Sequence, residues 1–208
     1  MESDFKKNIR KFKVRLNKSI KGSKMKTKKL CMSGICLTLC MLLPFLTGQI
    51  PYIGSALSPM HIPVLVCGLL CGGIYGAAIG FIAPLLRFLL FGMPPIFPIG
   101  VAMTFELVAY GMISGVMYHL LPKKKIHLYT SLIGAMLIGR GIWGLIRWTM
   151  ALLFGIEFSW QMFVSGAFIT AIPGMICHIL IIPILVMVFQ KIKDHENQEC
   201  GKEVECAD

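Results

Sequence analysis

Long apolar runs recur along this chain and limit what it can fold into. A membrane-crossing helix needs about 20 apolar residues, and by that measure hydropathy predicts five full spans and one short one. They cover Leu30 to Leu46, His61 to Cys71 (the short one), Gly73 to Phe91, Pro98 to Leu121, Leu128 to Phe154 and Val164 to Phe189. Composition agrees, because 56% hydrophobic and 15% charged residues, with a mean hydropathy of +0.73, are unusual for a soluble domain.

We therefore expect an all-α integral membrane protein with six transmembrane helices. One membrane domain, residues 30–191, follows a basic tail, 1–29, and precedes a polar tail, 192–208. The span from His61 to Cys71 is too short to cross alone, so it must be tilted or backed by neighbouring helices. The alternative is one bent hairpin from Ile62 to Phe91 that turns at Cys71 to Gly73. Both versions give the same topology.

Basic residues are concentrated at one end and predict the orientation. Met1 to Lys29 carries twelve of the twenty-one Lys and Arg against Glu2 and Asp4, a net charge of +10. The three segments expected outside, 47–59, 92–95 and 155–163, contain no Lys or Arg. Because Lys and Arg favour cytoplasmic loops, both termini are expected in the cytoplasm. The tail is expected to be attracted to the lipid bilayer, and no nucleic-acid partner is expected.

Few ionisable residues lie within the spans, and most of them fall in the outer half. Arg87 and Arg147 are near the outer ends of the third and fifth spans, Glu106 is in the outer part of the fourth, and Arg140 and His178 are near mid-depth. Arg87 alone could snorkel to headgroups. Together with a second arginine and a glutamate at similar depth, it favours a shared polar cavity that opens outward.

Two helical stripes combine aromatic and charged side chains. Their members are Arg140, Trp143 and Arg147 on the fifth span, and Met103, Glu106 and Tyr110 on the fourth. Such stripes are typical of a binding wall, but a helix–helix contact closed by one Glu–Arg pair is the alternative. Three arginines against one glutamate leave a positive surplus inside the membrane, which an anionic ligand would relieve. Bound lipid phosphate would serve equally well.

Other motifs limit the chemistry. Neither a GxxxxGK[ST] phosphate loop nor an HExxH motif occurs in the sequence, so ATP hydrolysis by a P-loop and the commonest zinc-protease site are not expected. The cysteines in the spans are expected to behave as small hydrophobes rather than metal ligands. Small residues recur as Gly34 with Thr38, and as Gly76, Gly80 and Ala83. These permit close helix packing, either internally or with a partner.

The segment "SPMHIPVLVCGLLCGGIYGAAIGFIAPLLRFLLFGMPP", residues 58–95, resembles the substrate-binding S components of energy-coupling factor (ECF) vitamin transporters. The likeness covers roughly Lys29 to Lys193. It implies six helices around an outward-facing ligand pocket in a bacterial cell membrane. It also implies partnership with a membrane T component and two ATPase subunits, which would explain the missing phosphate loop. No cofactor or metal and no enzymatic activity is expected; a self-contained membrane enzyme or permease is the alternative.

The resemblance gives the polar residues candidate roles. The expected ligand is a small, water-soluble vitamin or related anionic metabolite. Its candidate contacts are Arg87, Glu106, Trp143 and Arg147, followed by His61, Tyr110 and Arg140. The candidate partner interface is Gly34, Thr38, Gly76 and Gly80. The family often has an Ala-xxx-Ala pattern in the first helix, and Gly34-xxx-Thr38 is its nearest match here.

The orientation is testable by labelling engineered cysteines in intact cells with a membrane-impermeant reagent. Cysteines placed in 47–58 or 155–159 should react from outside, and cysteines placed in 123–125 should not. Reaction of the latter in intact cells would reverse the topology.

Overall fold

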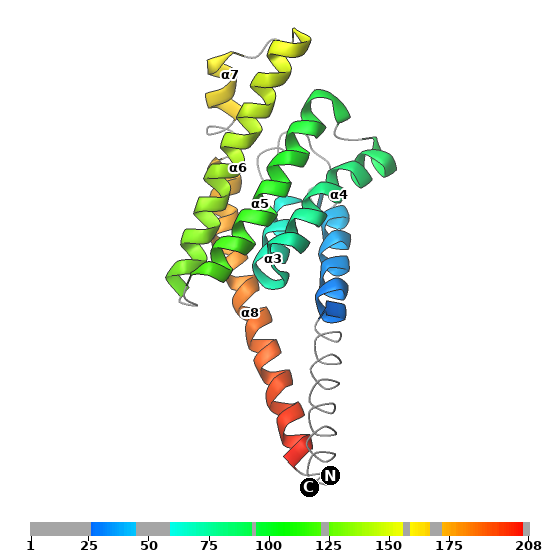
Figure 1. Cartoon of the computed structure of the whole chain (residues 1–208), viewed down its shortest axis with the longest axis vertical. Coiled ribbons are helices and arrows are strands. Elements are labelled where there is room, and N and C mark those ends of the chain that lie inside the picture. Colours follow the sequence, from blue (N-terminus) through cyan, green and yellow to red (C-terminus); the bar gives the residue numbers. More distant parts are fainter. Residues whose placement is uncertain are drawn as a thin grey trace, which may run out of the picture.

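A computed structural model describes residues 26–44, 59–92, 95–121, 125–155, 159–166 and 172–205. These residues form helices and no strand (Figure 1). After a first helix, Lys26–Pro44, the elements are α3 (His61–Cys71), α4 (Gly73–Phe91), η1 (Ile96–Gly100), α5 (Val101–Leu120), α6 (Lys125–Phe154), α7 (Trp160–Val164) and α8 (Ile172–Glu205). Within η1 the backbone is extended at Phe97 (φ −112°, ψ 134°), so η1 is an irregular lead into α5.

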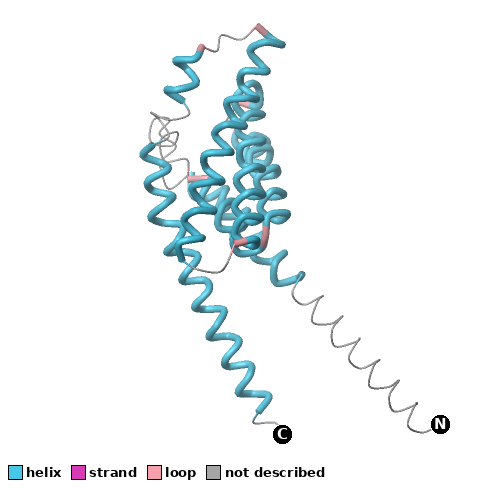
Figure 2. Tube along the Cα trace, turned by 60° about the vertical axis from the view of Figure 1, so that its left-hand side comes forward, coloured by secondary structure: helices cyan, strands magenta, loops and turns pink. Residues whose placement is uncertain are grey.

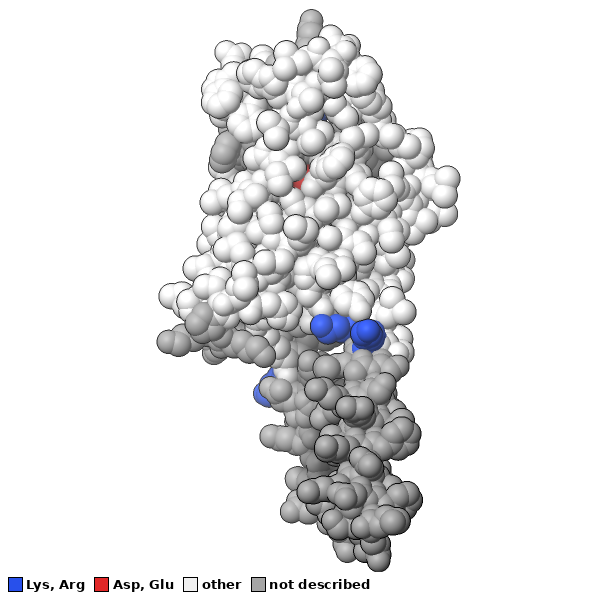
Figure 3. Space-filling view, viewed as in Figure 1, with Lys and Arg blue, Asp and Glu red and all other residues white. Residues whose placement is uncertain are grey.

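Five of the described helices are long and apolar enough to cross a membrane. These spans are Lys26–Pro44, Gly73–Phe91, Ile96–Leu120, Ile126–Phe154 and Ile172–Ile192. Residues other than Lys, Arg, Asp and Glu make up nearly all of the visible surface between the two ends of the bundle (Figure 3). Large hydrophobic residues such as Ile74, Leu89, Leu145 and Leu180 are exposed on it. In water this surface would be costly, so it is the surface that faces lipid.

The sixth expected crossing, α3, is a short helix enclosed by the others. Its 11 residues extend about 16 Å at 1.5 Å per residue, roughly half of a 30 Å hydrocarbon core. Ten of those residues are buried. Because neighbouring helices surround α3, it need not satisfy the length rule that applies to a lipid-facing span. Gly72, with φ 109°, turns the chain from α3 into α4.

Two boundaries differ from the sequence prediction. The last span was expected from Val164, but Val164 ends the separate helix α7, and α8 begins at Ile172. The side chain of Ser159 caps α7 by accepting a hydrogen bond from the Met162 N–H at 3.3 Å. Helix α8 also continues through the expected polar tail to Glu205 and projects beyond the bundle (Figure 2). Phe45 and Leu46, expected in the first span, lie outside the described residues.

The ends of successive helices lie alternately at the two ends of the bundle. Figure 1 shows the start of the first helix, the α3–α4 turn, the end of α5 and the start of α6 at the end where α8 leaves the bundle. The end of α6 and helix α7 lie at the opposite end (Figure 1). The described helix ends that flank 122–124 therefore lie at the end of the bundle opposite to α7.

Glycines allow α3, α4 and α5 to approach each other at backbone distance. A Cβ added at Gly76 would lie 2.7 Å from the Gly111 carbonyl oxygen and 2.7 Å from the Gly68 Cα. A Cβ added at Gly80 would lie 2.8 Å from the Val108 nitrogen. Such distances exclude any larger side chain without movement of the helices. The small-residue pattern of α4 thus serves internal packing.

This packing predicts different outcomes for two glycine-to-alanine changes in helices. Gly80→Ala should destabilise the protein by about 1 to 3 kcal/mol, because the added methyl group overpacks the α4–α5 contact. Gly141→Ala is the control: no atom lies within 4 Å of its added Cβ, and alanine favours the helix by up to about 1 kcal/mol. Thermal unfolding of the purified variants in detergent measures both. Equal melting temperatures for the two variants would contradict the close contact.

Candidate functional site

A buried cluster of polar side chains surrounds Glu106 in the interior of the bundle. The Glu106 Oε1 atom accepts a hydrogen bond from the Tyr110 hydroxyl at 2.8 Å. The same oxygen lies 3.2 Å from Arg140 Nε and 3.8 Å from His61 Nε2. Glu106 and Tyr110 are four residues apart on α5, so they share one face of that helix. The sequence stripes on α5 and α6 therefore meet at the Glu106–Arg140 ion pair.

Two histidines extend the cluster to α3 and α8. The His61 ring packs edge-on against Tyr110, with centroids 5.3 Å apart, and stacks on His178, with centroids 6.0 Å apart. His61 begins α3 and His178 lies in α8, and both are buried. His178 was placed near mid-depth by the sequence but was not among the candidate contacts. The cluster thus joins four helices, α3, α5, α6 and α8, at one point.

The ion pair resolves one of the alternatives that the sequence left open. The sequence allowed the two stripes to form either a binding wall or a helix–helix contact closed by one Glu–Arg pair. Glu106 and Arg140 form such a helix–helix contact. Both side chains are largely enclosed, with 3% and 14% of their areas exposed. Removing either partner would leave an uncompensated buried charge, which costs far more than an exposed pair gains. These residues consequently hold helices together, whatever else they contact.

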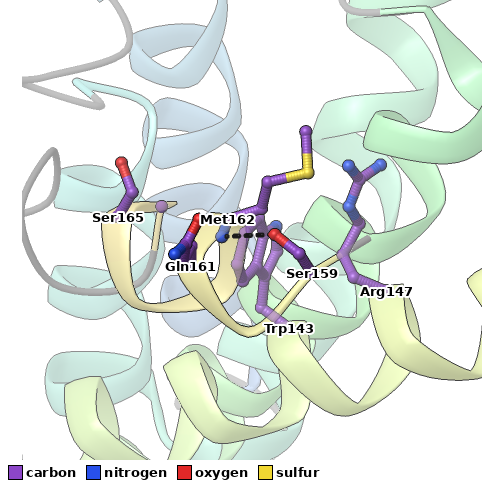
Figure 4. Close-up of a pocket in the computed structure, with 7 residues that line it drawn as sticks. Trp143, Arg147, Ser159, Gln161, Met162 and Ser165 are labelled. Atoms are coloured by element: carbon purple, nitrogen blue, oxygen red, sulfur yellow. Dashed lines mark hydrogen bonds between the residues drawn. The ribbon is translucent and has the colours of Figure 1, made fainter. Parts of the chain in front are cut away.

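An open cavity of about 480 Å³ lies between α6 and the segment around α7, and its lining residue Trp143 follows Arg140 of the cluster by three residues on α6. Trp143 and Arg147 of α6 line one side. The other lining residues are Ser159, Gln161, Met162, Ser165 and Gly166. In Figure 4, Trp143 and Met162 occupy the middle, Arg147 lies on one side, and Gln161 and Ser165 lie on the other. Helix α7, which supplies the lining residues Gln161 and Met162, lies at the end of the bundle opposite to the exit of α8 (Figure 1).

Two contacts between aromatic rings and glycines hold α7 against α6. A Cβ added at Gly144 would collide with the Phe163 ring, and one added at Gly166 would lie 2.9 Å from Trp143 Cη2. Each glycine therefore leaves room for a ring from the opposite segment. Sequence reasoning missed Gln161, Met162, Ser165 and this pairing, because α7 was read as part of a loop and the start of a span. The polar residues that follow a tryptophan in "SWQMFVSG" are the signal that could have found them.

Arg87 belongs neither to the cavity nor to the Glu106 cluster. It is half-buried, four residues before the end of α4. Figure 1 places that end of α4 on the opposite side of α5 from α7. The expectation that Arg87 and Arg147 share one cavity is therefore not supported by the described residues, because their helices diverge at this end. Contact of Arg87 with a ligand stays a prediction, as does the alternative that its side chain snorkels to headgroups.

The four candidate interface residues fall into two different environments. Gly34 and Thr38 are exposed on the first helix, no atom lies within 4 Å of a Cβ added at Gly34, and the Thr38 hydroxyl donates to the Gly34 carbonyl oxygen at 3.0 Å. Gly76 and Gly80 are buried against neighbouring helices. A partner cannot reach the latter pair without separating α4 from α5, so we remove both from the candidate interface.

The described part of the chain contains no group of three or more His, Cys, Asp or Glu side chains that could hold a metal ion. Its six cysteines are free thiols; Cys36, Cys40, Cys67 and Cys71 are buried in the core, whereas Cys31 is exposed and Cys177 is half-buried. The candidate site has two parts. One is the charged cluster around Glu106, which joins helices, and the other is the cavity that contains the guanidinium group of Arg147.

Comparison with known proteins adds one finding. Residues 28–186 match the family model described as ECF transporter, substrate-specific component. No curated protein and no solved structure matches the chain. The match covers more than half of the 208 residues, and the chain therefore belongs to the family of ECF transporter substrate-specific components.

Proposed function

We propose that this protein captures a small, water-soluble vitamin or related anionic metabolite at the outer face of a bacterial cell membrane. It delivers the ligand inward together with a membrane T component and two ATPase subunits. The observation that carries this proposal is the cavity lined by Trp143 and Arg147. Its volume of about 480 Å³ lies in the range typical of sites for small molecules.

The chemistry of the cavity favours a ligand rich in hydrogen-bond acceptors. Arg147 and Trp143 carry only donors, whereas Gln161, Ser159 and Ser165 carry both donors and acceptors. None of the described lining residues is acidic. A carboxylate or phosphate near Arg147 would receive charge-assisted hydrogen bonds, and a flat part of the ligand would pack on the Trp143 ring. A cationic ligand would find no compensating charge among these residues.

The Glu106 cluster has a supporting role in this proposal. Arg140 precedes Trp143 by three residues on α6, so the two side chains lie on the same face, about 4.5 Å apart along the helix axis. Fixing Arg140 on Glu106 therefore fixes the rotation of α6 and the direction in which Trp143 and Arg147 project. His61 and Tyr110 complete the set of groups around the carboxylate. We assign these four residues to positioning rather than to direct contact with the ligand.

The two outer arginines provide a matched test of ligand contact. Arg147→Ala should remove a charge-assisted contact worth roughly 1.5 to 3 kcal/mol, which lowers affinity by about 10- to 150-fold. Arg87→Ala removes the same charge outside the cavity and should leave affinity unchanged. Arg147→Lys should be a poor replacement, because lysine lacks the planar fork of donors. Calorimetry with the small molecule that the purified protein retains, identified by mass spectrometry, measures all three.

Thermal stability of each arginine variant controls for misfolding. Loss of affinity in Arg87→Ala, with full affinity in Arg147→Ala, would move the ligand to the other side of α5 and contradict the proposed cavity.

The exposed face of the first helix is the proposed contact with the T component. Gly34→Phe or Thr38→Phe should abolish uptake and weaken copurification of the T component and ATPase subunits, while ligand affinity of the isolated subunit stays near the original value. Leu39→Phe is the control, because Leu39 is also exposed but points about 140° away from Gly34 around the helix. Uptake assays in cells, together with copurification, report the outcome. Normal uptake in both Gly34 and Thr38 variants would place the contact on another helix.

A further inference from the structure

Basic side chains gather where the apolar surface ends, on the side of the bundle from which α8 projects. In Figure 3 the blue side chains lie along this lower border of the white surface. We define the basic collar as Lys26 and Lys29 of the first helix, Lys191 of α8 and the neighbouring Tyr75 of α4. Lys26 and Lys191 are exposed and Lys29 is half-buried. Their position at the border places the ammonium groups at the depth of lipid headgroups.

The collar is organised by contacts between helices. Lys26 and Lys29 are three residues apart and therefore share the face of the first helix that carries Ser33 and Cys36. The Lys29 ammonium lies 5.9 Å from the centroid of the Tyr75 ring, within the range of a cation–π contact. This contact links the side chain of Lys29 to α4. Lys29 is thus held beside a ring, whereas Lys26 and Lys28 of the same helix are exposed.

We propose that the basic collar binds the phosphate groups of anionic phospholipids, and that these lipids hold the inner end of the first helix against α3 and α4. The sequence that precedes the collar is also basic, because residues 1–25 carry nine Lys and Arg against Glu2 and Asp4, a net charge of +7. The single acidic residue among the described side chains, Glu106, is buried in the interior cluster. A lipid phosphate is the anion that occurs at this depth, and lysine at a membrane surface gains most from anionic lipid.

Two of the three collar lysines belong to the first helix, so an anchor at the collar acts directly on that helix. Its outer face exposes Leu30, Ile35, Leu39 and Leu42 to the surroundings. Two of its polar contacts with other segments are weak ones that involve sulfur: Ser33 Oγ lies 3.5 Å from Cys67 Sγ, and Cys40 Sγ donates to the Met60 carbonyl oxygen at 3.6 Å. Apolar packing in lipid has no hydrophobic driving force between helices. Electrostatic attraction at the collar therefore contributes to keeping this helix in place.

Lipid binding to the full-length protein tests the site directly. Native mass spectrometry of the delipidated protein measures its affinity for phosphatidylglycerol and for phosphatidylcholine. Phosphatidylglycerol should bind more tightly, and Lys26→Gln and Lys29→Gln should each weaken it about fivefold without changing the affinity for phosphatidylcholine. Lys29→Arg should retain the affinity. Lys202→Gln is the control: it removes the same charge from α8, ten residues beyond Ile192 and so about 15 Å past the apolar span.

The labelling of two native cysteines tests the effect on the helix. Cys36 is buried against α3, with 3% of its area exposed, whereas Cys31 on the same helix is exposed. In bilayers that contain phosphatidylglycerol, N-ethylmaleimide should modify Cys36 more slowly than in pure phosphatidylcholine, while the rate at Cys31 stays the same. The Lys26→Gln, Lys29→Gln double variant should lose this difference.

Three results would overturn the proposal. The first is equal affinity for the two lipids, or an equal loss in the Lys202→Gln control, since either would mean that no local site exists. The second is displacement of the lipid by soluble glycerol phosphate or by a short RNA at comparable concentration, which would identify a different ligand. The third is a Cys36 labelling rate that does not respond to phosphatidylglycerol.

Discussion

The ion pair between Glu106 and Arg140, 3.2 Å apart, is the interaction on which the rest of the interior depends. A carboxylate within the bilayer must be compensated, and here one oxygen is shared among a guanidinium, a phenol and an imidazole. Because these groups come from three helices, α3, α5 and α6, the need to compensate one charge fixes how those helices are rotated relative to each other. The direction of Trp143 and Arg147 toward the cavity follows from that rotation.

Close backbone packing supplies the second constraint. Gly76, Gly80 and Gly111 allow α4 and α5 to touch, which encloses the short helix α3 and places His61, its first residue, beside Glu106. A short helix inside a membrane protein is tolerated only where protein covers it. The polar cluster and the glycine contacts therefore depend on each other: the glycines bring α3 into the interior, and the cluster gives its first residue a polar environment there.

Helix positions followed from the sequence, because the length and apolarity of a lipid-facing span are set by the bilayer. That reasoning identified α4 with its observed bounds and a turn at Cys71 to Gly73, and it placed Glu106 on one stripe and Arg140, Trp143 and Arg147 on another. It could not separate α7 from α8, since a capped five-residue helix is decided by local hydrogen bonds such as Ser159 to Met162. It also grouped Arg87 with Arg147, because depth can be read from a sequence whereas the side of the bundle depends on packing.

The central claim is that Glu106 and Arg140 position the cavity without touching the ligand, and a double-mutant cycle tests it most directly. Glu106→Gln and Arg140→Met should each lower both thermal stability and ligand affinity, because each leaves one buried charge unpaired, at a cost of about 3 to 5 kcal/mol. The double variant has no unpaired charge and should recover most of both properties. Recovery of stability without recovery of affinity would mean that one of these charges binds the ligand itself, and would contradict the claim.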